Sequence, residues 1–291
     1  MKKSKVMLFG AMALTAGLAL AACGSSQSSN ADKTYSYIFV SNPDTLDYIT
    51  STRDSTSSIT TNLIDGLLEN DQYGNLIPSM AESWTVSKDG LTYTYKIRQG
   101  AKWYTSEGEE YADVTAHDFV TGLKYAADKK AENLYLVQDS IKGLADYVEG
   151  KSSDFGTVGV KAVDDYTLQY TLQYTLNQPE TYWNSKTTAS ILNPVNEAFL
   201  KSKGDDFGSV TPSSILSNGP YLFKSFTSKS LIEFDKNPNY WDKDNVKIEK
   251  VKLSFFDGSD QDSIARGFLD GNYTDGRIFP TSSVFAELVG K

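Results

Sequence analysis

The stretch from Ala81 to Asp118, AESWTVSKDGLTYTYKIRQGAKWYTSEGEEYADVTAHD, decides the fold of this chain. Its centre alternates strictly between apolar and polar residues, and the apolar ones are Leu91, Tyr93, Tyr95 and Ile97. This period of two predicts a strand with one buried face and one solvated face. Trp84 and Val86 alternate in the same way before it, and Asp89-Gly90 separates the two runs. The stretch therefore predicts a β-hairpin.

A helix is predicted directly after this hairpin. Gly100 ends the strand, and Thr115-Ala-His-Asp118 has the spacing with which a polar side chain caps the first turn of a helix. Apolar residues then recur at helical spacing, at Ala116, Phe119, Val120, Leu123 and Ala127. The pattern alone specifies packing and carries no chemistry.

These residues resemble the signature region of the large solute-binding proteins that serve peptide ABC transporters. The matching positions are Ala81, Glu82, Trp84, Asp89, Gly90, Arg98, Gly100, Ala116, Asp118 and Phe119. One departure is the turn 104–110, which is longer than the family's usual turn. The resemblance implies an α/β fold of the periplasmic-binding-protein type (type II), made of a first lobe with an inserted subdomain, and it implies no enzyme activity.

Further landmarks extend the resemblance over nearly all of residues 35–280. They are Thr45-Leu46-Asp47, Asn218-Gly219-Pro220-Tyr221, Asn237 to Trp241, and Asp270-Gly271-Asn272-Tyr273. The domains that follow are a signal peptide (1–22), a flexible tether (23–32), a discontinuous main subdomain of the first lobe (33–52 and 192–257), an inserted subdomain (53–191), and a hinge with the start of a second lobe (258–291). Because relatives continue well beyond this hinge, we expect the chain to be an N-terminal part that lacks most of the second lobe and binds peptides weakly or not at all.

The resemblance also supplies candidate ligand contacts. In relatives, the extended residues just before a helix pair with the backbone of the bound peptide, and by position these are Thr52, Arg53 and Asp54. Main-chain pairing suits a peptide of any sequence, because it leaves specificity to side-chain pockets. A polar surface loop is the alternative explanation of the same three residues, and both stay open.

The chain begins as a secretory signal does. Lys2, Lys3 and Lys5 precede an uncharged apolar run over 6–22, and small residues then lead into Cys23. This arrangement resembles a bacterial lipobox, which predicts cleavage before Cys23 and a lipid on its sulfur; the alternative is an ordinary signal with an incidental cysteine. Cys23 is the sole cysteine, so no disulfide framework is expected. The polar run 24–30 is typical of a flexible tether.

Composition excludes several other functions. The formal net charge is -9, and removal of the three leader lysines lowers it to -12, so nucleic acid is not expected as a partner. His117 is the only histidine, and we interpret it as a surface or capping residue; no catalytic relay or metal site is expected, and no cofactor. The sequence has neither a phosphate-binding loop nor a long apolar span, so it is neither the ATPase nor the permease of a transporter.

The predicted function is therefore capture of extracellular oligopeptides for import by the permease and ATPase of an ABC transporter. The receptor would be lipid-anchored at the extracellular face of a Gram-positive type of membrane. One alternative is a surface adhesin or a peptide-sensing lipoprotein without a role in transport. Another, a glycan hydrolase, needs two carboxylates at a defined separation in a cleft, and no such placement is visible.

Elsewhere, periodicity predicts strands over 35–40 and 246–256 and helices over 59–68, 134–148 and 263–269. A second hairpin is expected from 158–163 and 166–176 around Asp164-Asp165. Its second strand contains a tandem repeat, Thr-Leu-Gln-Tyr at 167–170 and again at 171–174. Because four is even, both copies keep their apolar residues on one face, and we expect the repeat to lengthen the strand or to force a bulge.

Overall fold

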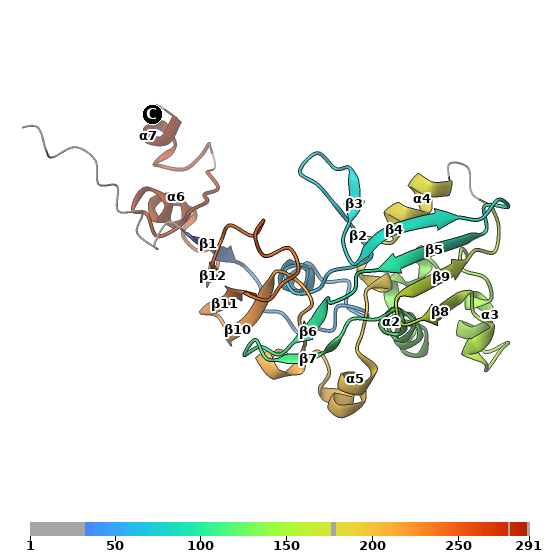
Figure 1. Cartoon of the computed structure of the whole chain (residues 1–291). Helices are drawn as coiled ribbons and strands as arrows, with labels where there is room; N and C mark the ends of the chain where they lie inside the picture. The colour runs from blue at the N-terminus through green and yellow to red at the C-terminus, as the bar shows by residue number, and fades with distance from the viewer. Residues whose placement is uncertain (1–32, 176–178, 279, 290–291) are drawn as a thin grey trace, which may run out of the picture. The chain divides into compact units, whose positions relative to one another are not determined.

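The structure, a computed structural model, describes residues 33–175, 179–278 and 280–289. Its main sheet has four strands in the order β1-β12-β11-β10 (Figure 1). Their bounds are Thr34–Phe39 (β1), Tyr221–Thr227 (β10), Leu231–Lys236 (β11) and Lys250–Phe255 (β12). β1 and β12 are parallel, and the other two pairs are antiparallel. The main sheet is therefore assembled from segments at opposite ends of the described chain.

The hairpin that the sequence predicts from 84 to 98 is confirmed. It lies in a second sheet of order β4-β5-β9-β8, with bounds Ala81–Val86 (β4), Thr92–Ile97 (β5), Val160–Asp164 (β8) and Thr167–Thr171 (β9). Trp84 pairs with Tyr95, and Gly90 in the turn has a φ of 72°. Tyr93, Tyr95 and Ile97 are buried as expected, and this apolar face forms part of the core.

Two short ribbons complete the strands. They are β2–β3, Leu68–Asn70 with Leu76–Pro78, and β6–β7, Lys102–Tyr104 with Glu110–Asp113. The long turn over 104–110 closes the β6–β7 ribbon. Tyr104 also bridges Ser217 through two backbone hydrogen bonds of 2.7 and 2.9 Å, which ties this ribbon to the segment before β10.

The helices are mostly short. They are α1 (Asp54–Thr60), α2 (Ala116–Lys129), α3 (Leu144–Val148), α4 (Pro179–Lys186), α5 (Glu197–Lys203), α6 (Gln261–Leu269) and α7 (Phe285–Val289), with 3₁₀ turns at Glu132–Leu136, Phe155–Thr157, Ser190–Leu192, Gly204–Asp206 and Pro212–Ser214. α2 begins where its capping pattern predicts, and the backbone N–H of Thr115 donates to Asp118 Oδ2 at 2.8 Å. In the ranges that the structure describes, no helix has the length and apolar character needed to cross a membrane.

The helix predicted over 134–148 is wrong. The chain instead forms a 3₁₀ turn, a bridge between Ile141 and Leu172, and the five-residue helix α3. Gly143 has a φ of 71°, and the N–H of Lys142 donates to the carbonyl of Thr171 at 3.0 Å. The helical spacing of apolar residues was therefore a signal of burial, and a contact with β9 determines the backbone.

The helix predicted over 59–68 is also too long, because α1 ends at Thr60. After it, the side chains of Thr61 and Asn62 donate back to the carbonyls of Ser57 and Ser58 at 2.7 and 2.8 Å. Leu68 lies in β2, where Leu68 pairs with Pro78. The apolar spacing therefore continues beyond α1 into a turn and β2, and does not mark the length of the helix.

The tandem repeat does not lengthen its strand as expected. β9 contains the first copy and ends at Thr171, and its register against β5 is unbroken. Leu172 is still buried, but Tyr174 is 48% exposed, and Leu176 lies outside the described residues. The second copy therefore leaves the sheet after its first two residues.

The strands of the main sheet lie within 34–39 and 221–255, and those of the second sheet lie within 81–171. By contacts, Lys33–Lys291 forms one unit. The domain limits at 52/53, 191/192 and 257/258 stay predictions. The signal peptide, the tether and Cys23 lie outside the described residues.

Candidate functional site

The candidate site is a crevice of about 830 Å³ at the carboxyl ends of the two parallel strands of the main sheet. Four segments line it: the end of β1 and the residues after it (37–41), the start of α1 (within 53–58), the end of β12 with its following turn (within 253–258), and the first half of α6. Arg277 completes the lining. In open α/β sheets, ligands bind in the crevice outside the carboxyl ends of the strands, and this pocket has that position.

Aromatic packing holds the two strands together at the crevice. The rings of Phe39 and Phe255 meet edge to face with centroids 5.3 Å apart. The N–H of Phe256 donates to the carbonyl of Phe39 at 2.9 Å, which continues the pairing one residue beyond β12. Ile264 of α6 is 3% exposed and supplies an apolar wall, whereas Val40 is 66% exposed. The crevice thus has a fixed apolar floor and an open rim.

Charged residues of both signs surround this floor. Arg53 and Arg277 line the crevice together with Asp54 and Asp257. The side chain of Arg53 is 67% exposed and forms an ion pair with Asp44, with 3.3 Å between Nε and Oδ2. The lining therefore carries two formal positive and two formal negative charges, which suits a ligand that bears both signs.

Tyr35 and Tyr37 of β1 connect the crevice to the segment after α6. Tyr35 donates its hydroxyl to Asp275 Oδ2 at 3.1 Å, and burial together with this bond raises the pKa of Tyr35 to about 12. Burial and Asp275 also raise the pKa of Tyr37, which lines the crevice, although Arg277 lowers it. Thr274 holds the same strand, because its N–H donates to the carbonyl of Ser36 and its hydroxyl oxygen accepts the N–H of Ser36. The outer edge of β1 is therefore fixed beside the site.

The structure brings two of the three predicted ligand residues to this crevice. Arg53 and Asp54 line it, and Asp54 is the first residue of α1. Thr52 does not line it, because its hydroxyl donates to Glu132 Oε2 at 3.0 Å. Whether any of the three touches a peptide stays a prediction.

The sequence interpretation missed Asp257, Gln261 and Arg277. All three follow β12, and their place beside Arg53 depends on the parallel pairing of β12 with β1. The one available signal was Asp257-Gly258, a turn directly after a predicted strand, where Gly258 has a φ of 82°. A turn signal does not reveal which other strand lies alongside.

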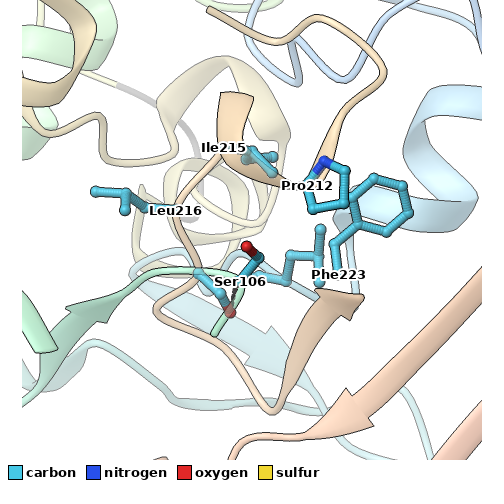
Figure 2. A pocket seen from close by; sticks show the side chains of 7 residues that line it. Ser106, Pro212, Ile215, Leu216 and Phe223 are labelled. Carbon is cyan, nitrogen blue, oxygen red and sulfur yellow. Dashed lines mark hydrogen bonds between the residues drawn. The ribbon is translucent and has the colours of Figure 1, made fainter. Parts of the chain in front are cut away.

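Several other features of the described residues lie outside this crevice. The hollow shown in Figure 2 has essentially no room for a water molecule, so it is not a ligand pocket. It is lined by Leu63, Ser106, Pro212, Ile215, Leu216, Ser217 and Phe223. Ser217 contributes to its packing, since its hydroxyl bonds the carbonyl of Leu63 at 2.8 Å. His117 is 3.3 Å from Asp165, and neither residue lines the crevice. Among the described residues, no group of three His, Cys, Asp or Glu side chains could hold a metal ion.

The described residues thus form an α/β fold with a candidate crevice at the carboxyl ends of two parallel strands. A profile of the bacterial extracellular solute-binding proteins, family 5, matches residues 75–289. The chain belongs to this family. The resemblance inferred from the motifs is therefore confirmed, and the family consists of binding proteins.

Relatives with known names support this assignment. The chain is 63% identical over 283 residues to the oligopeptide-binding protein AliB of Streptococcus pneumoniae serotype 4, which covers 97% of this chain and 42% of that protein. It is 60% identical over 296 residues to the oligopeptide-binding protein SarA of Streptococcus gordonii, covering 99% of this chain and 44% of that protein. The chain thus spans less than half the length of these relatives.

Solved structures confirm the expected fold type. The substrate-binding domain of an oligopeptide ABC transporter from Bacillus anthracis matches with a TM-score of 0.74 at 30% identity, over 83% of this chain and 44% of that one. OppA of Listeria monocytogenes, solved with a bound peptide, matches with a TM-score of 0.73 at 29% identity, over 83% and 45%.

Proposed function

We propose that the crevice at the ends of β1 and β12 binds oligopeptides, and that the protein is the receptor of a peptide ABC transporter. The observation that carries this proposal is the composition of the crevice: an apolar floor with two arginines and two aspartates around it, beside an edge strand. A peptide carries an amino terminus and a carboxylate, and a lining with both charges complements them. The relatives' names and the peptide bound to the Listeria protein support the same ligand.

Backbone pairing is the second part of the proposal. β1 is at the edge of the main sheet, and residues 38–41 line the crevice. Bound peptides commonly add a strand to such an edge, because main-chain bonds do not depend on side chains. The extended backbone of Arg53, with φ -79° and ψ 135°, is suited to the same pairing. Thr52 supports it indirectly, since its bond to Glu132 holds the segment before α1.

The cellular setting extends this proposal. The lipobox pattern at Cys23 would attach the mature protein to the extracellular face of the membrane, and the polar run 24–30 would leave it room to move. The partners would be a membrane permease and an ATPase, which take over the captured peptide. Closure of the site around its ligand followed by delivery needs no chemical step.

Mapping by NMR would test the peptide site directly, because it detects weak and strong ligands alike. The purified, ¹⁵N-labelled chain would be titrated with a mixture of short peptides of diverse sequence. We expect the shifted amides to cluster at residues 38–41, 53–58 and 257–264. No shift, or shifts spread away from these segments, would overturn the proposal.

Variants would sharpen this experiment. Arg53→Ala and Asp54→Ala each remove a charged lining group, and each is expected to weaken binding by about tenfold, the usual order for a hydrogen bond to a charged partner. Lys88→Ala, in the exposed turn between β4 and β5, is the matched control and should leave binding unchanged. Equal losses in the control and in the crevice variants would count against the assignment.

A further inference from the structure

A second pocket, separate from the crevice, lies beside Trp84. Its volume is about 520 Å³, and its lining consists of Asn70, Gly74, Asn75, Leu76, Trp84, Asn184, Ser185 and Thr188. It has no residue in common with the peptide crevice, and none of its lining side chains is charged. We infer that this pocket binds a neutral saccharide.

Three elements form this pocket at the edge of the second sheet. Trp84 lies on β4 opposite Tyr95, so both side chains are on the same face of the sheet. Figure 1 shows α4 and the β2–β3 ribbon next to β4, and both contribute lining residues. Tyr95 donates its hydroxyl to Asn184 Oδ1 at 2.6 Å, which fixes α4 against the sheet. Trp84, at the margin of this contact, remains half-buried and borders the pocket.

Asn184 is the residue that points to a ligand. It is only 2% exposed, and its carbonyl oxygen is occupied by Tyr95. Its amide nitrogen donates no hydrogen bond among the described residues, and it is not one of the buried side-chain atoms that lack a partner, so it is open to the pocket. Since Asn184 lines the pocket, an acceptor oxygen on a bound molecule would satisfy this donor.

The remaining polar groups complement Asn184. Asn75 donates through Nδ2 to Asp71 Oδ2 at 2.9 Å, which leaves its Oδ1 as an acceptor. Asn70 is exposed, and its carboxamide supplies both a donor and an acceptor. Ser185 and Thr188 donate to backbone carbonyls of their own segment and keep their lone pairs. The pocket therefore offers neutral donors and acceptors together, which match the adjacent hydroxyls of a sugar.

The apolar part of the lining favours one kind of neutral ligand, a sugar ring. The indole of Trp84 and the side chain of Leu76 offer an apolar surface, against which the C–H face of a pyranose ring can pack. Phosphates and free peptide termini are bound most strongly by charged partners, and the lining has none. A polyhydroxylated ring with no net charge therefore fits both the polar and the apolar groups.

The NMR signals of the indole N–H groups allow sugar binding to be tested without assigning the whole spectrum. The chain has four tryptophans, so a ¹⁵N spectrum shows four indole signals. Glucose, galactose and N-acetylglucosamine would each be added up to about 50 mM, enough to fill most of a site with a millimolar Kd. We expect the Trp84 signal to shift and saturate with at least one sugar, while the signals of Trp103 and Trp241 stay in place.

Asn70→Ala should weaken the sugar's binding by about three- to tenfold, the usual effect of losing one neutral hydrogen bond. Asn272→Ala, another exposed asparagine and one outside the pocket, is the matched control and should change nothing. The inference is overturned if no sugar moves the Trp84 signal, if all four indole signals move together, or if a blocked neutral dipeptide moves it and sugars do not. The result is independent of the peptide crevice, because the two pockets share no residue.

Discussion

Stability should fall as the pH rises from about 4 to about 7, and Asp65→Asn should remove much of this dependence. Asp65 is 8% exposed, and its Oδ2 accepts the hydroxyl of Tyr240 at 2.7 Å and the indole N–H of Trp241 at 3.3 Å. Burial raises the pKa of Asp65 to about 6 despite these bonds. The pKa of Glu69 is raised to about 7 by burial and then by Asp65, although Arg98 lowers it.

The direction of the effect follows from these pKa values. A carboxyl group whose pKa is higher in the folded protein than its ordinary value binds its proton more tightly when folded. Its contribution to stability is complete below the ordinary value, 3.8 for Asp65, and is lost as the pH rises through about 6. One pH unit corresponds to about 1.4 kcal/mol, so Asp65 alone accounts for a loss of about 3 kcal/mol across this window.

Asparagine at position 65 is neutral at every pH. Its carbonyl oxygen can still accept from Tyr240, but its new amide donor needs a partner, at a cost of about 1 kcal/mol. We therefore expect the variant to be less stable than the parent near pH 5 and equally or more stable near pH 8. The pKa of Glu69 should also move toward its ordinary value, because the charge of Asp65 is gone. The two stability curves should cross.

Urea unfolding, followed by tryptophan fluorescence at a series of pH values from about 4.5 to about 8, measures both curves. Part of the slope will remain in the variant, because burial also raises the pKa of Asp118 to about 6. Asp139→Asn is the control: Asp139 is exposed and forms no side-chain bond within the described ranges, so this change should leave the slope intact. Parallel curves for Asp65→Asn and the parent, or parent stability that rises from pH 5 to pH 7, would refute the reasoning.

Three other outcomes are expected. Cys23→Ala should move the protein from the membrane fraction to the medium; a variant that stays in the pellet after an alkaline wash would mean that the apolar leader is an uncleaved span. Deletion of residues 171–174 should leave a folded protein, because Thr175-Leu176 would take the places of Thr171-Leu172 in the same register. A fall in melting temperature of more than about 10 °C would contradict this. Gly122→Ala should lower the free energy of unfolding in urea by about 2–4 kcal/mol, because a Cβ there would lie 2.2 Å from the carbonyl oxygen of Asn193. An unchanged free energy of unfolding would show that the segment around Asn193 can move away.

Local signals in the sequence predicted the elements whose backbone is determined locally. The β4–β5 hairpin needs only its alternation and a glycine with positive φ at position 90, and both are visible in the sequence. The start of α2 needs only Thr115 and Asp118, which are three positions apart in the first turn. The helix over 134–148 failed for the opposite reason. Its apolar spacing is correct for burial, but the bridge between Ile141 and Leu172 is a long-range contact that no local pattern records.

The same distinction divides the candidate site. Arg53 and Asp54 could be found because the segment before α1 is continuous with a motif. Asp257 and Arg277 could not be found, because only the pairing of β1 with β12 brings them near Arg53. This pairing joins distant parts of the sequence: Lys33 and Glu249, which are in contact beside it, are 216 positions apart. The polar pocket beside Trp84 was equally hidden, since it joins side chains of β2–β3, β4 and α4.

The link between the two sheets explains why the carboxyl group of Asp65 matters beyond its own burial. Asn218 accepts the N–H of Asp65 at 2.9 Å and donates to its carbonyl oxygen at 3.1 Å, which fixes the segment before β2 to the segment before β10. Tyr240 and Trp241, which follow β11, hold the side chain of the same residue. Asp65 is therefore bonded through its backbone and through its side chain to the segments that flank β10 and β11 of the main sheet. Because one proton changes the cost of burying this residue, pH acts on the junction between these segments. The crevice at the carboxyl end of β1 is instead held by the Phe39–Phe255 contact and by Thr274, neither of which titrates.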